Sequence, residues 1–403
     1  MDKEAYLGGP TEKLIKNAIK NIISHVKDEC FSRFNQMHIS QQAGVEARLL
    51  AEHLGIPENM DAALSDIEHM LSKGALNEKQ ELSALALHAQ LRGIWLAQVS
   101  LDTLRDSALE SSNPTVQKYF SKLNRDCYAA LFVDRGPLEK NGPFAFENES
   151  GYLNGMCKAL SRALPKTEHP DSLTSDFIIG IHDLCCENVY KTNCYQQDCE
   201  TIKFSLPDHT LDDVRKFQTG VRSECGNEYS TTITKKGLEE LNELAKQDYH
   251  IKHDSCYSDM CERNEPFINY TFYKTTPLDE PNPDGLRGLK LETTALGYNS
   301  ESAKENFLTR VDGYLNEYHN QSKCNENEII DAISTLLRNI EMSHLFEDGN
   351  GRTENVLLNK LLLDNGLSPC ALDDTNIFSG HSIEEMRDVI KSGQKRFQQL
   401  GSC

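Results

Sequence analysis

The stretch SHLFEDGNGRTEN, residues 343–355, lies between two apolar segments of different pattern. Before it, apolar side chains in residues 329–340 recur at the spacing of one helix face. After it, residues 356–363 are apolar almost all round, which is typical of a deeply buried helix. Asn365-Gly366 then supplies a helix end. The sequence therefore predicts a helix, a loop and a buried central helix, with the quoted residues in the loop and the first turn.

The residue types in this loop suit the binding of a phosphate. A helix N-terminus offers unpaired N–H groups to an anion, and Gly349 and Gly351 allow the backbone to approach it closely. Arg352 adds a charged donor, Asp348 suits a magnesium ion, and His344 can accept a proton near neutral pH. Together they indicate transfer of a phosphate-containing group to a hydroxyl. The alternative is a plain Asp-Gly-Asn-Gly turn between two core helices.

Composition limits the other possibilities. The chain has 403 residues, 42 Lys and Arg against 62 Asp and Glu, and a formal net charge of −20, which argues against general nucleic-acid binding. We find no apolar stretch long enough to cross a bilayer and no signal peptide, so we expect no transmembrane segment. The sequence predicts a cytoplasmic protein, or a secreted effector that acts in a host cytosol.

The pattern along the chain is mainly helical. We expect an N-terminal helical bundle over 1–134, a Gly- and Pro-rich linker over 135–150, and a catalytic domain over 151–400. A polar, cysteine-containing insertion interrupts that domain at about 190–265. The insertion holds four possible zinc ligands, but free reduced thiols are the favoured interpretation and zinc the alternative. These ligands are His250, His253, Cys256 and Cys261.

The run HLFEDGNGR, residues 344–352, resembles the signature of Fic-domain proteins, H-P-F-x-(D/E)-G-N-G-R-x-x-R. The resemblance implies a mainly α fold, with a Fic-type helical core and a short β-hairpin flap that aligns the target. It implies transfer of AMP from ATP to a Ser, Thr or Tyr hydroxyl of a target protein; relatives transfer UMP, phosphate or phosphocholine. PNPDGLRGLKLET, residues 281–293, resembles the flap. Its target-docking residues would be Gly285, Leu286, Arg287, Gly288 and Leu289.

The resemblance assigns a role to each matching residue. His344 would be the base that deprotonates the target hydroxyl, Phe346 would anchor the loop in the core, and Asp348 would hold Mg²⁺ against the donor's phosphates. The anion hole would be formed by three residues, with the asparagine on the transferred phosphate, and the arginine would contact the donor's phosphates. These residues are Gly349, Asn350, Gly351 and Arg352.

Two positions depart from the signature. Leu345 replaces the usual proline, which shapes the loop and supplies no functional group. Asn355 replaces the second arginine, which in the family contacts the γ-phosphate of ATP. This change leaves room for a diphosphate donor such as a CDP-linked headgroup. We also find no inhibitory helix of the family's S/T-x-x-x-E-(G/N) type.

Three hypotheses follow, in this order. The first is transfer of AMP from ATP with Mg²⁺. The second is transfer of phosphocholine, UMP or another nucleotide-linked group by the same fold. The third is a catalytically degenerate Fic fold that serves as a binding scaffold. For both enzymes the partner would be a target protein that carries the modified hydroxyl, a host signalling protein among the candidates.

Overall fold

Helices dominate the structure, a computed structural model, which confirms the mainly α fold class. The β-strands that it contains form one small sheet. The structure describes residues 10–27, 37–147, 149–164, 173–187, 189, 228–234, 236–237, 240, 251–253, 270–277, 289–296, 301–343, 346, 349–375, 377–378 and 380–401. Most of the predicted insertion lies outside these ranges, with the cysteines of the possible zinc site.

The N-terminal helices pack around an apolar core of their own. Ile15, Ile19 and Ile22 recur along one face of the first helix and are buried against the helices that follow. The last of the four helices starts with a capping box, in which Asn77 and Gln80 satisfy each other's backbone N–H groups. The helices are α1 (Pro10–His25), α2 (Met37–Leu54), α3 (Pro57–Ser72) and α4 (Glu78–Glu110).

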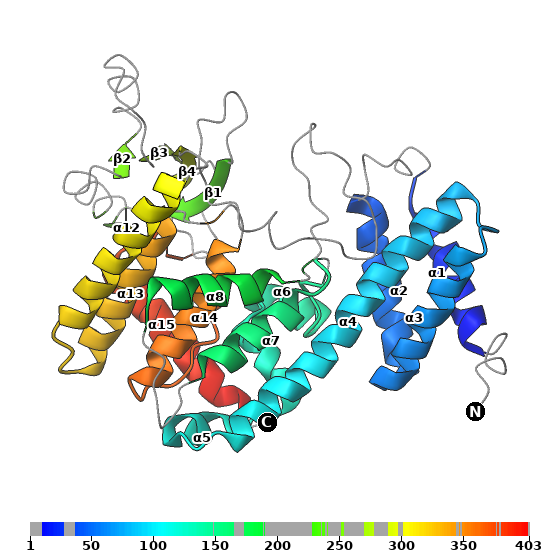
Figure 1. Cartoon of the computed structure of the whole chain (residues 1–403), viewed down its shortest axis with the longest axis horizontal. Coiled ribbons are helices and arrows are strands. Elements are labelled where there is room, and N and C mark those ends of the chain that lie inside the picture. The colour runs from blue at the N-terminus through cyan, green and yellow to red at the C-terminus, as the bar shows by residue number, and fades with distance from the viewer. Residues whose placement is uncertain are drawn as a thin grey trace, which may run out of the picture.

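Helix α4 belongs to two cores at once, and it runs from the N-terminal helices into the rest of the molecule (Figure 1). Its buried residues from Leu82 to Ile94 pack in the N-terminal core, whereas those from Ala97 to Ala108 pack in the larger core. The larger core also takes in residues that follow α4, up to Val133. The expected linker at 135–150 therefore does not mark the division between the two cores, because that division falls within α4.

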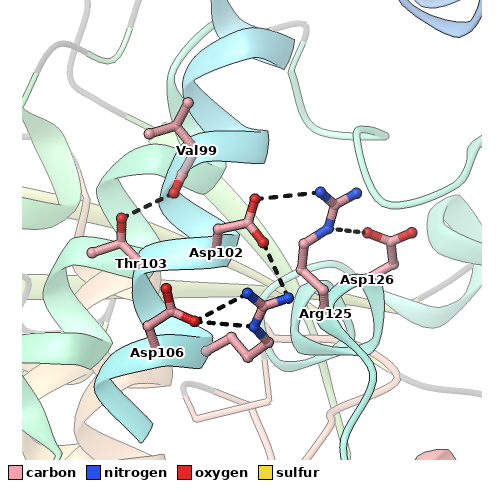
Figure 2. Close-up of polar contacts among 7 residues, drawn as sticks. Val99, Asp102, Thr103, Asp106, Arg125 and Asp126 are labelled. Atoms are coloured by element: carbon pink, nitrogen blue, oxygen red, sulfur yellow. Dashed lines mark hydrogen bonds and ion pairs between the residues drawn. The ribbon is translucent and has the colours of Figure 1, made fainter. Parts of the chain in front are cut away.

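Charged side chains join the far end of α4 to the segment that follows it. Asp102 of α4 pairs with Arg105 at 3.3 Å and with Arg125 at 3.4 Å. Figure 2 shows Asp102 next to Arg125, which also faces Asp126. Each arginine also pairs with a neighbouring carboxylate, Asp106 at 3.0 Å and Asp126 at 2.9 Å. Such exposed pairs add little stability each, but they connect α4 with the segment that begins at Arg125.

The larger core is built around α14 (Asn350–Asp364), the buried helix that the sequence predicts. Helices α7, α8 and α13 contact it directly. These three and the other helices of this part of the chain form the shell around the core. They are α5 (Pro114–Phe120), η3 (Arg125–Leu131), α6 (Arg135–Asn141), α7 (Tyr152–Ala163), α8 (Ser175–Cys186), α12 (Glu301–Asn320), α13 (Glu326–Ser343) and α15 (Ile383–Leu400).

A four-stranded sheet stands beside the upper ends of α12 and α13, with the order β1-β4-β3-β2 (Figure 1). Strands β3 (Tyr270–Pro277) and β4 (Leu289–Leu296) pair antiparallel, and β1 (Glu228–Ile233) and β2 (Ile251–His253) flank them. The connection between β3 and β4, with the expected flap residues 285–288, lies outside the described residues. The flap therefore stays a prediction, and of its predicted residues only Leu289 is placed, as the first residue of β4.

Residues after β1 attach the sheet to the helical core. Thr234 Oγ1 donates a hydrogen bond of 2.6 Å to Glu385 Oε2 at the start of α15, and Lys236 Nζ pairs with Glu384 at 2.6 Å. Glu240 accepts a hydrogen bond from Arg338 of α13. The insertion is thus joined to α13 and α15, two helices that pack against each other.

Candidate active site

Phe346 anchors the loop between α13 and α14. Its side chain is buried, and its ring stacks on the imidazole of His182 with centroids 3.7 Å apart and planes 13° apart. His182 lies on α8, a helix that the sequence places more than 150 residues earlier. The stack therefore holds the middle of the motif against a helix that is distant in the chain.

The side chain of Asn350 is hydrogen-bonded to the backbone of Phe346. Its Oδ1 accepts a hydrogen bond of 3.0 Å from the backbone N–H of Phe346, and its Nδ2 donates one of 2.7 Å to the carbonyl of Phe346. The side chain is buried. In this geometry its amide shapes the loop, whereas the resemblance places it on the transferred phosphate. That predicted contact stays a prediction.

The two glycines of the motif have different surroundings. Gly349, the N-cap of α14, has φ 78°, and a Cβ there would overlap the Sγ of Cys186 and lie 3.3 Å from the His182 ring. Its carbonyl accepts hydrogen bonds from Thr353 N at 3.0 Å and Thr353 Oγ1 at 2.8 Å. A Cβ on Gly351 would meet nothing within 4 Å among the residues placed in the structure. Packing thus requires the first glycine, whereas no described residue occupies the position next to a Cβ on the second.

Arg352 lies beside α7 and α8. Its side chain is 10% exposed; Nη1 donates to the Cys185 carbonyl at 3.4 Å, and Nη2 is 3.8 Å from Glu149 Oε2. Its Cζ lies 6.0 Å from the centre of the Tyr152 ring. Sequence reasoning missed Glu149, because it falls in a stretch expected to be a linker.

Asn355, at the position of the family's second arginine, is only 1% exposed. Its Oδ1 accepts a hydrogen bond of 3.3 Å from Asn359, and Asn359 Oδ1 in turn accepts one of 2.8 Å from the backbone N–H of Cys370. The Nδ2 of Asn355 has no hydrogen-bond partner among the described residues. An uncharged amide inside the core therefore stands where a guanidinium would face a γ-phosphate.

Glu354 of α14 is buried behind the motif and lies near the half-buried Glu341 of α13. Burial, followed by the charge of Glu341 and a hydrogen bond to it, raises the pKa of Glu354 well above its ordinary value. A hydrogen bond between two carboxyl groups requires a proton on one of them. Folding therefore favours a proton shared by this pair.

We expect Glu354→Gln to flatten the pH dependence of stability. Because the folded pKa is raised, the folded chain binds this proton more tightly than the unfolded chain, and stability falls as pH rises above about 5. The variant lacks this titration, so its Tm should decline less than the parent's between about pH 5 and pH 9. Differential scanning fluorimetry across this range measures the effect. Glu341→Gln should flatten the curve as well, and equal slopes in all three proteins would contradict the shared proton.

Two of the predicted site residues, His344 and Asp348, lie outside the described residues. The described residues contain no group of three or more His, Cys, Asp or Glu side chains that could hold a metal. Magnesium is commonly held by one or two carboxylates together with the phosphates of its ligand, so such a group is not required for the predicted site. The described part of the motif therefore consists of the buried Phe346, the first turn of α14 and Arg352.

Comparison with known proteins agrees with this geometry. Residues 283–362 match the model of the Fic/DOC family, a range that includes β4, α12, α13, the motif and most of α14. This region is a Fic-family domain. The sequence resemblance stated above is thereby confirmed.

A curated relative is similar over a longer part of the chain. The Phosphocholine transferase AnkX of Legionella pneumophila is 37% identical over 287 residues, which are 65% of this chain and 27% of the relative. The chain thus spans about a quarter of the relative's length. No helix in the described ranges is both long and apolar enough to cross a membrane.

Proposed function

We propose that the chain transfers phosphocholine from CDP-choline to a hydroxyl of a target protein. The observation that carries the proposal is Asn355, which supplies a buried neutral amide where recognition of ATP would use a guanidinium on the γ-phosphate. A donor with two phosphates needs no such contact. The name of the similar phosphocholine transferase agrees with this donor.

Transfer of AMP, the first of the three hypotheses, is supported by the motif as a whole but not by Asn355. Transfer of UMP from UTP has the same difficulty, because UTP also carries a γ-phosphate. A scaffold without activity would not need an arginine held in place at the start of α14. Phosphocholine transfer is therefore the better supported of the hypotheses.

The reaction would proceed by direct displacement. His344 takes the proton of the target hydroxyl, whose oxygen bonds to the phosphorus that carries choline; the bond from this phosphorus to the CMP oxygen breaks, and CMP leaves. Arg352 and the backbone N–H groups in the first turn of α14 stabilise the charge that develops on the phosphate oxygens. Mg²⁺, held by Asp348, would add further neutralisation of the diphosphate.

The partner in this proposal is a protein rather than a small acceptor, as in the Fic family. A host signalling protein as target, and action in a host cytosol, belong to the same proposal. To test this part of the proposal, the chain is incubated with CDP-choline and an extract of candidate host cells, or with a bacterial extract under the same conditions. The measurement is which extract contains proteins that become modified.

The test uses the full chain with Mg²⁺ and a donor panel of ATP, CTP, GTP, UTP and CDP-choline. We expect CMP release from CDP-choline by liquid chromatography, and a self-modification by one phosphocholine in the intact mass. His344→Ala is the inactive control. An AMP adduct from ATP, with CDP-choline unused, would select the AMP hypothesis instead. If no donor is consumed and His344→Ala behaves like the parent, the scaffold hypothesis stands.

A further inference from the structure

Residues 143–147 and 149–152, which lead into α7, form a series of turns. The side chains on the two sides of this segment have different surroundings. Glu149 N donates to the Phe146 carbonyl at 3.1 Å, and Tyr152 N donates to the Glu149 carbonyl at 3.0 Å. Glu147 N bonds the Phe144 carbonyl in the same way, at 3.1 Å. Contacts place Phe146, Glu149 and Tyr152 on one shared side of the segment: the Phe146 and Tyr152 rings meet edge to face, and Arg352 lies near both Glu149 and Tyr152.

The opposite side of this segment is fixed to α4 and to α7. The carboxylate of Glu147 is buried and accepts hydrogen bonds from Gly151 N at 2.7 Å and Leu153 N at 2.8 Å. Ser150 Oγ donates to the Ala89 carbonyl of α4. The packing is so close that a Cβ on Gly93 would overlap the side chains of Glu147 and Ser150. The shared side is thus presented by a braced backbone.

That shared side meets the arginine of the motif. Glu149, 28% exposed, lies 3.8 Å from Arg352, and the Arg352 guanidinium lies 6.0 Å from the Tyr152 ring centre. The ring of Phe146 meets that of Tyr152 edge to face, with centroids 5.2 Å apart. One carboxylate and one aromatic ring therefore lie beside the group that would bind the donor's phosphate, and a second ring, Phe146, packs on the first.

From this arrangement we propose that Phe146, Glu149 and Tyr152 form the subsite for the quaternary ammonium of the donor's choline. The inference rests on the proposed function, which it deepens by naming the residues that select the headgroup. Quaternary ammonium groups are bound by aromatic rings and by carboxylates, because their charge is spread over methyl groups and they offer no N–H donor. The class of ligand is a choline-bearing nucleoside diphosphate.

The two charged groups of phosphocholine are opposite in sign to the two neighbouring charged side chains of the protein. Phosphocholine places a negative phosphate next to a positive ammonium, two carbons apart, and the protein places Arg352 next to Glu149. The Arg352–Glu149 contact is long, and a carboxylate has two oxygens with several acceptor positions. The donor can therefore exchange one weak internal pair for two: phosphate with Arg352, and ammonium with Glu149.

The test is isothermal titration of the full chain with CDP-choline and with CDP as probes. We expect the parent to bind CDP-choline about tenfold more tightly than CDP, a ratio set by the cation–aromatic and carboxylate contacts. Glu149→Gln and Phe146→Leu should reduce this ratio towards one through weaker binding of CDP-choline, with CDP affinity changed less than about twofold. Glu139→Gln, an exposed carboxylate on α6, is the matched control and should keep the parent ratio.

Each other result has a definite meaning. If Glu149→Gln tightens CDP and CDP-choline equally, Glu149 only competes with the donor for Arg352, and the subsite is overturned. The subsite also fails, with the proposed function intact, if the parent releases CMP from CDP-choline while both variants keep the parent ratio. If the parent neither prefers CDP-choline nor releases CMP from it, both proposals fail. Unchanged Tm values confirm that the variants fold.

Discussion

Gly349→Ala is expected to lower the free energy of unfolding of the larger core by roughly 2–5 kcal/mol and to abolish transfer. Two costs add up at this position. The backbone has φ 78°, a left-handed conformation that is unfavourable for alanine. The new Cβ would also overlap Cys186 Sγ and press on the His182 ring that supports Phe346. The loop must therefore shift, and with it the start of α14.

Urea unfolding followed by far-UV circular dichroism measures the loss of stability, and CMP release measures the loss of transfer. Gly351→Ala is the matched control for stability, because a Cβ there meets nothing placed in the structure within 4 Å and alanine favours a helix. Its stability should equal or exceed the parent's by up to about 1 kcal/mol. A Gly349→Ala protein as stable as Gly351→Ala would show that Cys186 does not confine the loop.

The motif and its central helix could be predicted because the information is local. The apolar run over 356–363 specifies a buried helix, and the glycines and Asn365-Gly366 mark its two ends within a few residues of chain. The departure at Asn355 was visible from the motif as well. The structure adds that the Asn355 side chain is buried and accepts a hydrogen bond from Asn359. The side chain at this position is therefore uncharged and shielded from solvent.

Contacts between distant segments could not be predicted in the same way. The signal for the stretch over 135–150 was its Gly, Pro and Asn content, which predicts turns correctly but does not say what the turns contact. The structure places Glu149 of that stretch against Arg352, about 200 residues later in the chain. Likewise, the helical stripe in α4 indicates one buried face, and no local pattern shows that its two halves serve different cores.

The support beneath the loop is a further example. His182 and Cys186 lie four residues apart on α8, a spacing that places them on one helix face. From the sequence alone that pair has many possible interpretations. The structure shows their role: His182 and Cys186 of α8 pack against Phe346 and Gly349, so α8 supports the motif.

The Phe346→Ala variant should show whether the Phe346 ring positions the motif or contributes only to packing of the core. Removing a buried phenylalanine ring costs about 3–5 kcal/mol, and here it also removes the stack on His182. Phe397 of α15 is a matched control, because it is equally buried, at 2% exposure, in the same core and packs edge to face on Phe120. Both alanine variants should lose similar stability in urea unfolding.

Their activities should differ. At a temperature where both variants remain folded, Phe397→Ala should release CMP at a rate close to the parent's, whereas Phe346→Ala should lose most of the activity. The reason is that the backbone N–H and carbonyl of Phe346 hold Asn350, so a ring that no longer anchors the loop lets the first turn of α14 move. Phe346→Leu, which refills part of the space, should recover stability more than activity. Equal activities in Phe346→Ala and Phe397→Ala would mean that the ring contributes packing alone.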